Sequence, residues 1–185
     1  DKIRPRVRET AKILWIIYVG ITIVQMISLK IAGMETFDSI CHAFTTMPTG
    51  GFSTKNSSIA YFDNPMIHYI IIFFMFIAGV NFSLHFRAIN GDAKAYLKDL
   101  EFLVYLFIII FISLIIFISL SNISSTKIEQ IIRESLFGTI AILTGTGYVL
   151  GDYGMWPVFV QMLLLTLMFI GGMGGSTTGG MKIVR

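Results

Sequence analysis

Two short clusters of threonine and glycine decide how this chain folds: Thr49-Gly50-Gly51-Phe52 and Gly145-Thr146-Gly147-Tyr148. Each cluster follows a moderately apolar stretch, Thr36–Met47 and Ile128–Leu143, that is too short to cross a bilayer. A short helix that enters the membrane, followed by an irregular loop that leaves it, is typical of a re-entrant segment. We therefore predict two re-entrant pore helices with irregular loops after them. The alternative is a pair of helices lying on the outer surface.

The composition around the clusters is that of a membrane protein. Of 185 residues, 55% are apolar and 14% are charged. An ordinary soluble domain is about 45–50% apolar and about 25% charged. A soluble enzyme, a disordered chain and a nucleic-acid-binding protein are therefore poor fits. The single cysteine, Cys41, excludes an intrachain disulfide.

Four apolar stretches are long enough to cross a bilayer, which takes about 20 residues. They are Ile13–Leu29, Met66–Phe86, Phe102–Leu120 and Val158–Met173. If the N-terminus lies inside, ten Lys and Arg residues fall in the inner segments and four in the outer ones. This excess, which includes Lys2 and Arg185, predicts that both ends of the segment are cytoplasmic.

The clusters belong to an internal repeat. Placing Ser39 on Ser135 aligns them without a gap, and Pro65 then corresponds to Pro157, each just ahead of a predicted span. The nine residues from Met75 share five identities with the nine from Met168. The predicted fold class is an all-α integral membrane protein made of span–pore helix–loop–span units, with about four transmembrane helices and two re-entrant pore helices. The units are residues 1–101 and 102–185.

The chemistry of the clusters suits a monovalent cation. Irregular backbone at membrane depth is tolerated where it is buried in protein or lines a water-filled cavity. Glycine adopts positive φ, so successive carbonyls can face one axis and replace the water around an ion. Neither cluster contains a carboxylate, which favours K⁺ or Na⁺ over divalent ions. We predict a selectivity filter formed by the backbone carbonyls of Thr49, Gly50, Gly51, Phe52, Gly145, Thr146, Gly147 and Tyr148. The alternative is that the glycines serve ordinary turns.

A second glycine-rich stretch interrupts the fourth predicted span. Six of the ten residues 171–180 are glycine, and each disfavours a continuous helix by about 1 kcal/mol. We predict a loop that gates the pore from its inner side. It consists of Gly171, Gly172, Gly174, Gly175, Ser176, Thr177, Thr178, Gly179 and Gly180. The alternative is close helix packing through small residues four positions apart. Asn81 and Ser83 lie at the corresponding depth of the first unit, where we expect a less broken helix.

Enzymatic chemistry finds little support in the sequence. The histidines His42, His68 and His85 fall on separate segments without the spacing of metal ligands. The spans contain neither paired carboxylates nor a Ser/His arrangement. We expect no catalytic residue and no cofactor bound by this chain, and we expect K⁺ to meet only the carbonyls of the filter residues.

These segments resemble the Trk/Ktr/HKT superfamily, and within it the potassium-uptake proteins of TrkH/KtrB type. The resemblance covers nearly all of the chain. It is carried by residues 42–46 leading into 49–54, by 81–86, by 145–148 and by 169–182. It identifies residues 1–101 with the second repeat and residues 102–185 with the third of four repeats whose loops surround one ion path. Met47-Pro48 and Gly145 depart from the family pattern and leave the rigidity of the loops in doubt.

The resemblance implies K⁺ uptake across the inner (cytoplasmic) membrane through a carbonyl-lined filter and a glycine-rich gate. It also implies further repeats in a longer chain, a homodimer, and a cytoplasmic regulatory subunit of TrkA/KtrA type that binds the nucleotide. Contact with nucleic acid is not expected. Two alternatives stay open: a Na⁺-conducting or Na⁺/H⁺-coupled K⁺ transporter of the same group, and a membrane scaffold that conducts nothing.

Overall fold

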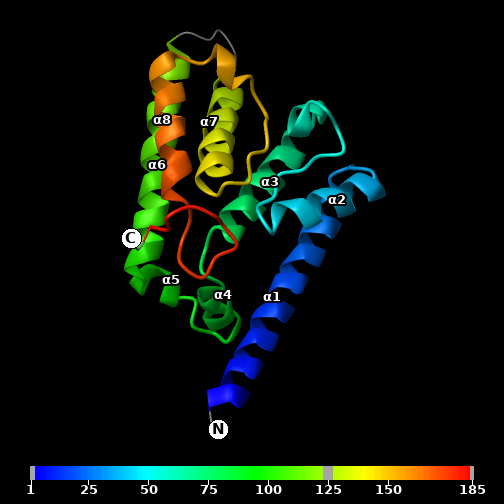
Figure 1. Ribbon diagram of the computed structural model, residues 1–185. Coiled ribbons are helices and arrows are strands. Elements are labelled where there is room, and N and C mark those ends of the chain that lie inside the picture. Colours follow the sequence, from blue (N-terminus) through cyan, green and yellow to red (C-terminus); the bar gives the residue numbers. More distant parts are fainter. Residues whose placement is uncertain (1–2, 123–126, 184–185) are drawn as a thin grey trace.

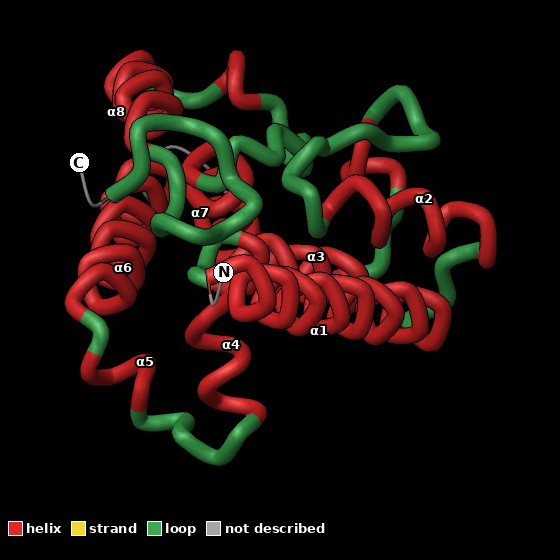
Figure 2. The backbone as a smooth tube through the Cα atoms, turned by 60° about the horizontal axis from the view of Figure 1, so that its bottom comes forward, coloured by secondary structure: helices red, strands yellow, loops and turns green. Residues whose placement is uncertain are grey.

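The computed structural model describes residues 3–122 and 127–183, so Lys2 and Arg185 of the predicted inner charges lie outside the described residues. This part of the chain is helical and contains no strand (Figure 2). Its elements are α1 (Ile3–Ile31), α2 (Thr36–Thr46), η1 (Ser58–Tyr61), α3 (Pro65–Ala78), α4 (Phe82–Ile89), α5 (Ala95–Lys98), α6 (Leu100–Ser121), α7 (Ile128–Leu143), η2 (Tyr153–Met155) and α8 (Val158–Ile170).

One order of elements occurs twice along the chain. A long apolar helix, α1 or α6, is followed by a shorter helix, α2 or α7, then by a loop with a 3₁₀ turn and by an apolar helix, α3 or α8. Figure 1 shows α6, α7 and α8 on one side of the molecule and α1 and α2 on the other. Helix α3 packs against α7 as well as α1 and α2, so it joins the two halves.

Two helices are long and apolar enough to cross a membrane by themselves, Arg8–Ile31 and Leu100–Ser121. They contain the predicted spans Ile13–Leu29 and Phe102–Leu120. Helix α8 has 13 residues, which corresponds to a length of about 20 Å. It ends three residues before the predicted limit at Met173, because Gly171 adopts a φ of 76° that no α-helix can continue.

The prediction of a continuous span over Met66–Phe86 is wrong. Helix α3 ends at Ala78 and α4 begins at Phe82, and the two are bent by 101° at the break. The side chain of Asn81 accepts the N–H of Ser83 at 2.9 Å, which is an N-cap that starts the second helix. The first unit is therefore also interrupted, but its helix resumes after three residues, whereas no helix follows Ile170 in the described part of the second unit, so the first is the less broken of the two as expected.

The predicted pore helices are present as helices. Helix α7 has the predicted bounds, and α2 ends one residue before Met47. With 11 and 16 residues, they reach about 16 and 24 Å, less than the roughly 30 Å of a hydrocarbon core. Each is followed directly by one of the two Thr/Gly clusters.

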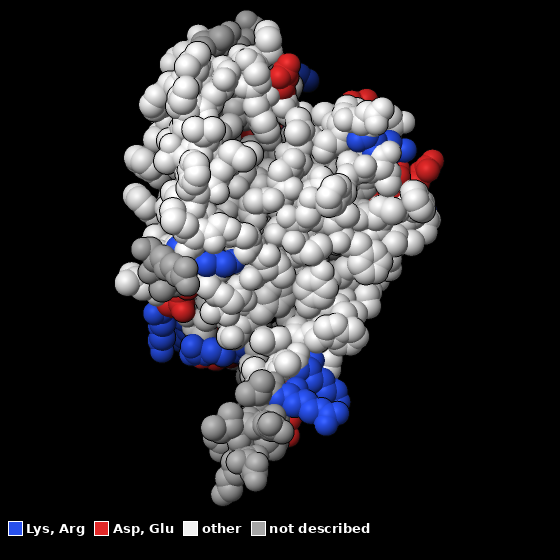
Figure 3. All heavy atoms as spheres, viewed as in Figure 1, with Lys and Arg blue, Asp and Glu red and all other residues white. Residues whose placement is uncertain are grey.

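The outer surface of the bundle suits a lipid environment. Large apolar side chains point away from the protein along α1, α6 and α8, among them Trp15, Phe107 and Phe159. On the face shown in Figure 3, most charged atoms lie toward the two ends of the molecule and leave a broad uncharged area between them. Such an area is unfavourable in water and favourable in a bilayer.

Candidate functional site: two Thr/Gly clusters and a glycine-rich loop

Both clusters adopt the same backbone pattern. Thr49 and Gly51 have φ angles of 56° and 64°, and their repeat equivalents Gly145 and Gly147 have 69° and 73°. Gly50 and Thr146, which lie between them, are not among the described residues with positive φ. Left-handed residues that alternate with ordinary ones turn successive carbonyls toward one side, as a cation path requires.

Each cluster is tied to the last turn of the helix before it. The N–H groups of Gly50 and Gly51 donate to the carbonyl of Thr45 at 2.9 and 3.1 Å, and Gly147 N–H donates to the carbonyl of Ala141 at 2.9 Å. Thr45 and Ala141 are equivalent positions in the repeat. The loop thus satisfies carbonyls that a helix end leaves unpaired, and it lies where the helix carries about half a negative charge.

The structure brings the two clusters into contact. The backbone of Gly51 lies directly against the carbonyl group of Thr146. The aromatic residues that end the clusters differ, since Tyr148 is fully buried and reaches α2 of the other half while Phe52 is 77% exposed. Gly145 and Gly147 are exposed and border open space, with nothing within 4 Å of a side chain added there.

The glycine-rich loop lies against the first cluster. The Oγ1 atom of Thr177 is 2.7 Å from the carbonyl oxygen of Met47, to which it donates, and 3.1 Å from that of Ala78. The Oγ1 atom of Thr49 is 3.3 Å from the carbonyl oxygen of Thr177. These contacts join the end of α2, the end of α3 and the loop at one point (Figure 1).

The two interruptions of the spans pair with each other. Met173 N–H donates to the carbonyl of Gly79 at 3.0 Å, and Phe82 N–H donates to that of Gly175 at 3.1 Å. A side chain at Gly175 would come within 2.8 Å of the Asn81 amide oxygen. Backbone groups left free by each broken helix are therefore satisfied by the other, as burial away from water demands.

Two charged side chains hold the loop on its other side. Glu101, in the first turn of α6, accepts the N–H of Gly174, and the Lys182 ammonium donates to the carbonyl oxygen of Thr178. Of the predicted gating residues, Gly171, Gly172 and Thr178 are buried, Gly174, Ser176 and Thr177 are half-buried, and Gly175, Gly179 and Gly180 are exposed.

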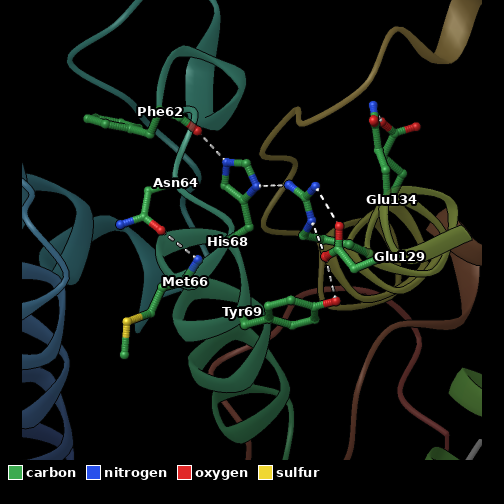
Figure 4. A network of polar contacts seen from close by, with 9 residues as sticks. Phe62, Asn64, Met66, His68, Tyr69, Glu129 and Glu134 are labelled. Atoms are coloured by element: carbon green, nitrogen blue, oxygen red, sulfur yellow. Dashed lines mark hydrogen bonds and ion pairs between the residues drawn. The ribbon is translucent and has the colours of Figure 1, made fainter. Parts of the chain in front are cut away.

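Sequence reasoning missed a partly buried polar network between α3 and α7 (Figure 4). The Arg133 guanidinium donates from Nε to Glu129 at 2.9 Å and also contacts the Nδ1 atom of His68. Tyr69 donates its hydroxyl to the same carboxylate at 3.0 Å. The spacing of Glu129 and Arg133 predicts their pairing on one helix face, but no sequence signal indicates the contact with His68.

A second missed contact lies at the N-terminal end of α2. The carboxylate of Asp38 accepts a hydrogen bond from Thr54 at 2.7 Å and pairs with Lys55 at 3.2 Å. The hydrogen bond to Asp38 raises the pKa of Lys55, so this ammonium stays charged at neutral pH. The pair anchors the segment after the first cluster to the first turn of α2.

No group of three or more His, Cys, Asp or Glu side chains in residues 3–122 and 127–183 is placed to hold a metal ion. The oxygens that the predicted filter segments offer are backbone carbonyls, threonine hydroxyls and the hydroxyl of Tyr148, which is bonded to α2. Such oxygens suit weakly held monovalent cations, whereas divalent ions are usually held with carboxylates.

Comparison with known proteins gives consistent matches along the chain. The family model TrkH, described as a cation transport protein, matches residues 1–185. The Trk system potassium uptake protein TrkH of Escherichia coli K12 is 41% identical over 188 residues, and TrkG of the same strain is 33% identical over 186. These alignments cover 100% of this chain but only 39% and 38% of the two relatives.

A solved structure agrees with the sequence matches. The crystal structure of the potassium transporter TrkH from Vibrio parahaemolyticus matches with a TM-score of 0.93 and 42% identity, covering 98% of this chain and 40% of that one. The chain therefore spans about two fifths of the length of these relatives.

Proposed function

This chain belongs to the TrkH family of cation transport proteins, and we propose that it forms two of the units through which a longer protein takes up K⁺ across the cytoplasmic membrane. Relatives that match the whole chain are named as potassium uptake proteins. Because the chain covers 39% of their length, the activity is proposed for the complete protein. Residues 1–101 and 102–185 supply two walls of the ion path, and the remaining repeats supply the others.

The shared backbone geometry of the two clusters carries the proposal. Left-handed residues alternate at equivalent positions, Thr49 and Gly51 in one cluster and Gly145 and Gly147 in the other. A hydrated ion enters from outside and exchanges its water for the carbonyls of residues 49–52 and 145–148. The C-terminal ends of α2 and α7 add favourable negative potential at that point.

The glycine-rich loop acts as the gate below this filter. The contacts of Thr177 with Met47 and Ala78 support its location next to the first cluster. Opening requires these hydrogen bonds to break and the loop to move aside. The complete protein is a homodimer in this proposal, and a cytoplasmic nucleotide-binding subunit controls the movement of the loop. Both ends of this segment face the cytoplasm. This chain binds no cofactor of its own.

Uptake of radioactive Rb⁺ into liposomes that hold the full-length protein tests the proposal, with K⁺ or Na⁺ as competitor. We expect K⁺ to halve uptake at a far lower concentration than Na⁺ does. Equal competition by Na⁺ would instead favour the Na⁺-conducting alternative. A folded, inserted protein without uptake would favour the scaffold.

A matched pair of glycine variants connects that uptake to the clusters. Gly147→Val places a β-branched side chain on a left-handed backbone in the second cluster, and it should abolish uptake. Gly20→Ala lies in α1, where nothing comes within 4 Å of the added methyl group, and it should leave uptake unchanged. Loss of uptake in both variants would contradict a specific role for the cluster.

A further inference from the structure

Tyr148 connects the two repeats behind the predicted filter. Its side chain is fully buried, and its hydroxyl oxygen lies 2.6 Å from Thr45 Oγ1 and 3.2 Å from Thr46 Oγ1. The carbonyl oxygen of His42 is 3.3 Å away. All three partners are on α2, the pore helix of the other unit, so a residue of the second cluster is held by the first unit.

The hydroxyl groups form a continuous chain of hydrogen bonds. Thr45 Oγ1 also lies 2.8 Å from the carbonyl oxygen of Phe52 and 2.9 Å from that of Cys41, and its one proton is shared between these two acceptors. Thr46 donates its own proton to the carbonyl of His42 at 2.6 Å. Because both carbonyls beside Thr45 can only accept, Thr45 keeps its proton for them if Tyr148 donates to Thr45. The chain then runs from Tyr148 through Thr45 to the last carbonyl of the first cluster.

The imidazole of His42 supports the same connection. One ring nitrogen lies 2.7 Å from the carbonyl oxygen of Asp38, and the other lies 2.9 Å from Ser53 Oγ. The ring packs against that of Tyr148 with a centroid separation of 6.0 Å. The segment that follows Phe52 and the tyrosine ring are thus fixed to the same helix.

This connection is not a consequence of the repeat. The equivalents of Tyr148 and Thr45 are Phe52 and Ala141, which have no hydroxyl groups. The hydrogen-bond chain therefore exists in one direction only, from the second cluster to the first unit. Burying a tyrosine hydroxyl is unfavourable unless it finds partners, so the pairing with Thr45 also fixes where the ring can lie.

We propose that the chain Tyr148–Thr45–Phe52 fixes the spacing between the two filter segments and makes Tyr148 and Thr45 positioning residues for ion selectivity. This inference rests on the proposed function, since selectivity requires an ion path. In the cavity-size account of selectivity, a filter prefers K⁺ because its carbonyls are kept from closing around the smaller Na⁺. Hydrogen bonds from behind the loops resist that closure without occupying the path.

The test measures selectivity separately from flux, in the full-length protein in liposomes. The concentrations of K⁺ and Na⁺ that halve Rb⁺ uptake give a selectivity ratio for each variant. Tyr148→Phe and Thr45→Val remove one hydroxyl each while keeping the shape of the side chain. We expect the Na⁺/K⁺ ratio of these concentrations to fall about fivefold, the factor equivalent to one net hydrogen bond. Thr45→Ser retains the hydroxyl and should retain the ratio.

Tyr96→Phe is the matched control, because it removes a tyrosine hydroxyl that bonds to His85 at 2.7 Å, outside both clusters. It should leave the ratio unchanged. An unchanged ratio in Tyr148→Phe and Thr45→Val, or an equal fall in Tyr96→Phe, overturns the proposal. If Tyr148→Phe does not fold, the comparison of Thr45→Val with Thr45→Ser decides. Absence of Rb⁺ uptake in the unaltered protein would contradict the proposed function itself.

Discussion

Gly51 and Gly147 occupy equivalent positions in the two repeats and share a left-handed backbone, yet their surroundings differ. A methyl group on Gly51 would lie 1.7 Å from the carbonyl oxygen of Thr146, whereas one on Gly147 would have nothing within 4 Å. Both positions favour glycine for its backbone conformation. Only Gly51 also requires the absence of a side chain, because the other cluster lies against it.

Alanine at these two positions should therefore have unequal effects. Gly147→Ala carries only the strain of a left-handed residue, about 1–2 kcal/mol, and should keep measurable Rb⁺ uptake. Gly51→Ala also pushes the two clusters apart and should abolish uptake. Thermal unfolding in detergent and uptake in liposomes measure the two effects. Equal losses of stability and uptake in Gly147→Ala and Gly51→Ala would mean that only the left-handed backbone matters and that the contact of Gly51 with Thr146 does not.

The Thr177 hydroxyl should hold the gate closed. Thr177→Val removes the donor to Met47 and Ala78 at nearly constant volume, so the loop loses a contact with the filter. We expect Rb⁺ uptake in the absence of any regulatory partner to rise several-fold, since one hydrogen bond is worth about 1 kcal/mol. Thr177→Ser keeps the donor and serves as the control. A similar decrease of Rb⁺ uptake in Thr177→Val and Thr177→Ser would contradict this role.

Glu101 should restrain the same loop from the side of α6. Replacing it by alanine frees the N–H of Gly174. The readout is a cysteine at Gly179, an exposed position with nothing within 4 Å, in a Cys41→Ser background. We expect Glu101→Ala to increase the rate of maleimide labelling several-fold.

Asp99→Ala provides the control for this measurement. Asp99 caps α6 by accepting the N–H of Phe102 at 2.9 Å, so its replacement by alanine weakens the start of the same helix without touching the loop. Labelling in Asp99→Ala should stay at the original rate. An increase of equal size there would assign the effect to α6 and not to the contact with Gly174.

The buried Arg133 should need its carboxylate partner for stability. Its side chain is 11% exposed and that of Glu129 is 51% exposed, so Glu129→Gln leaves a mostly buried cation with weaker neutralisation (Figure 4). We expect the free energy of unfolding to fall by about 1.5–3 kcal/mol, the usual range for a hydrogen bond to a charged group.

The exposed pair of Arg87 and Asp92 offers the comparison. Its side chains are 53% and 48% exposed, and Asp92→Asn should change stability by less than about 1 kcal/mol. Thermal unfolding in detergent measures both variants. A larger loss of stability for Asp92→Asn than for Glu129→Gln would show that burial does not determine how much each ion pair stabilises the fold.

Local pattern was enough to predict most of the helices. Helix α7 begins and ends where the apolar stretch does, and α6 extends the predicted third span by two residues at its start and one at its end. The predicted Thr/Gly clusters and the predicted glycine-rich loop are both irregular segments in the structure. These features depend on neighbours in sequence, through hydrogen bonds within helices and the conformational freedom of glycine.

The break between α3 and α4 was missed because hydropathy alone does not record a change of direction. Met66–Phe86 is apolar enough for one span, but Asn81 caps a new helix and the glycine-rich loop occupies the space beside it. At the break itself, a methyl group on Gly79 would lie 2.1 Å from the hydroxyl of Tyr105, so the backbone there packs against α6 with no room for a side chain. The asparagine followed two residues later by serine was the one local signal of an N-cap.

The sequence by itself determined that this chain is a repeated helical membrane segment, where the shorter helices α2 and α7 lie, and which residues suit a left-handed backbone. Those properties follow from composition, periodicity and the absence of a side chain in glycine. Only the tertiary structure decided that Tyr148 bonds to Thr45, that Gly51 meets Thr146, and that Glu101 holds Gly174. Each of these pairs joins residues far apart in the chain, so it depends on how whole helices pack and not on any local pattern.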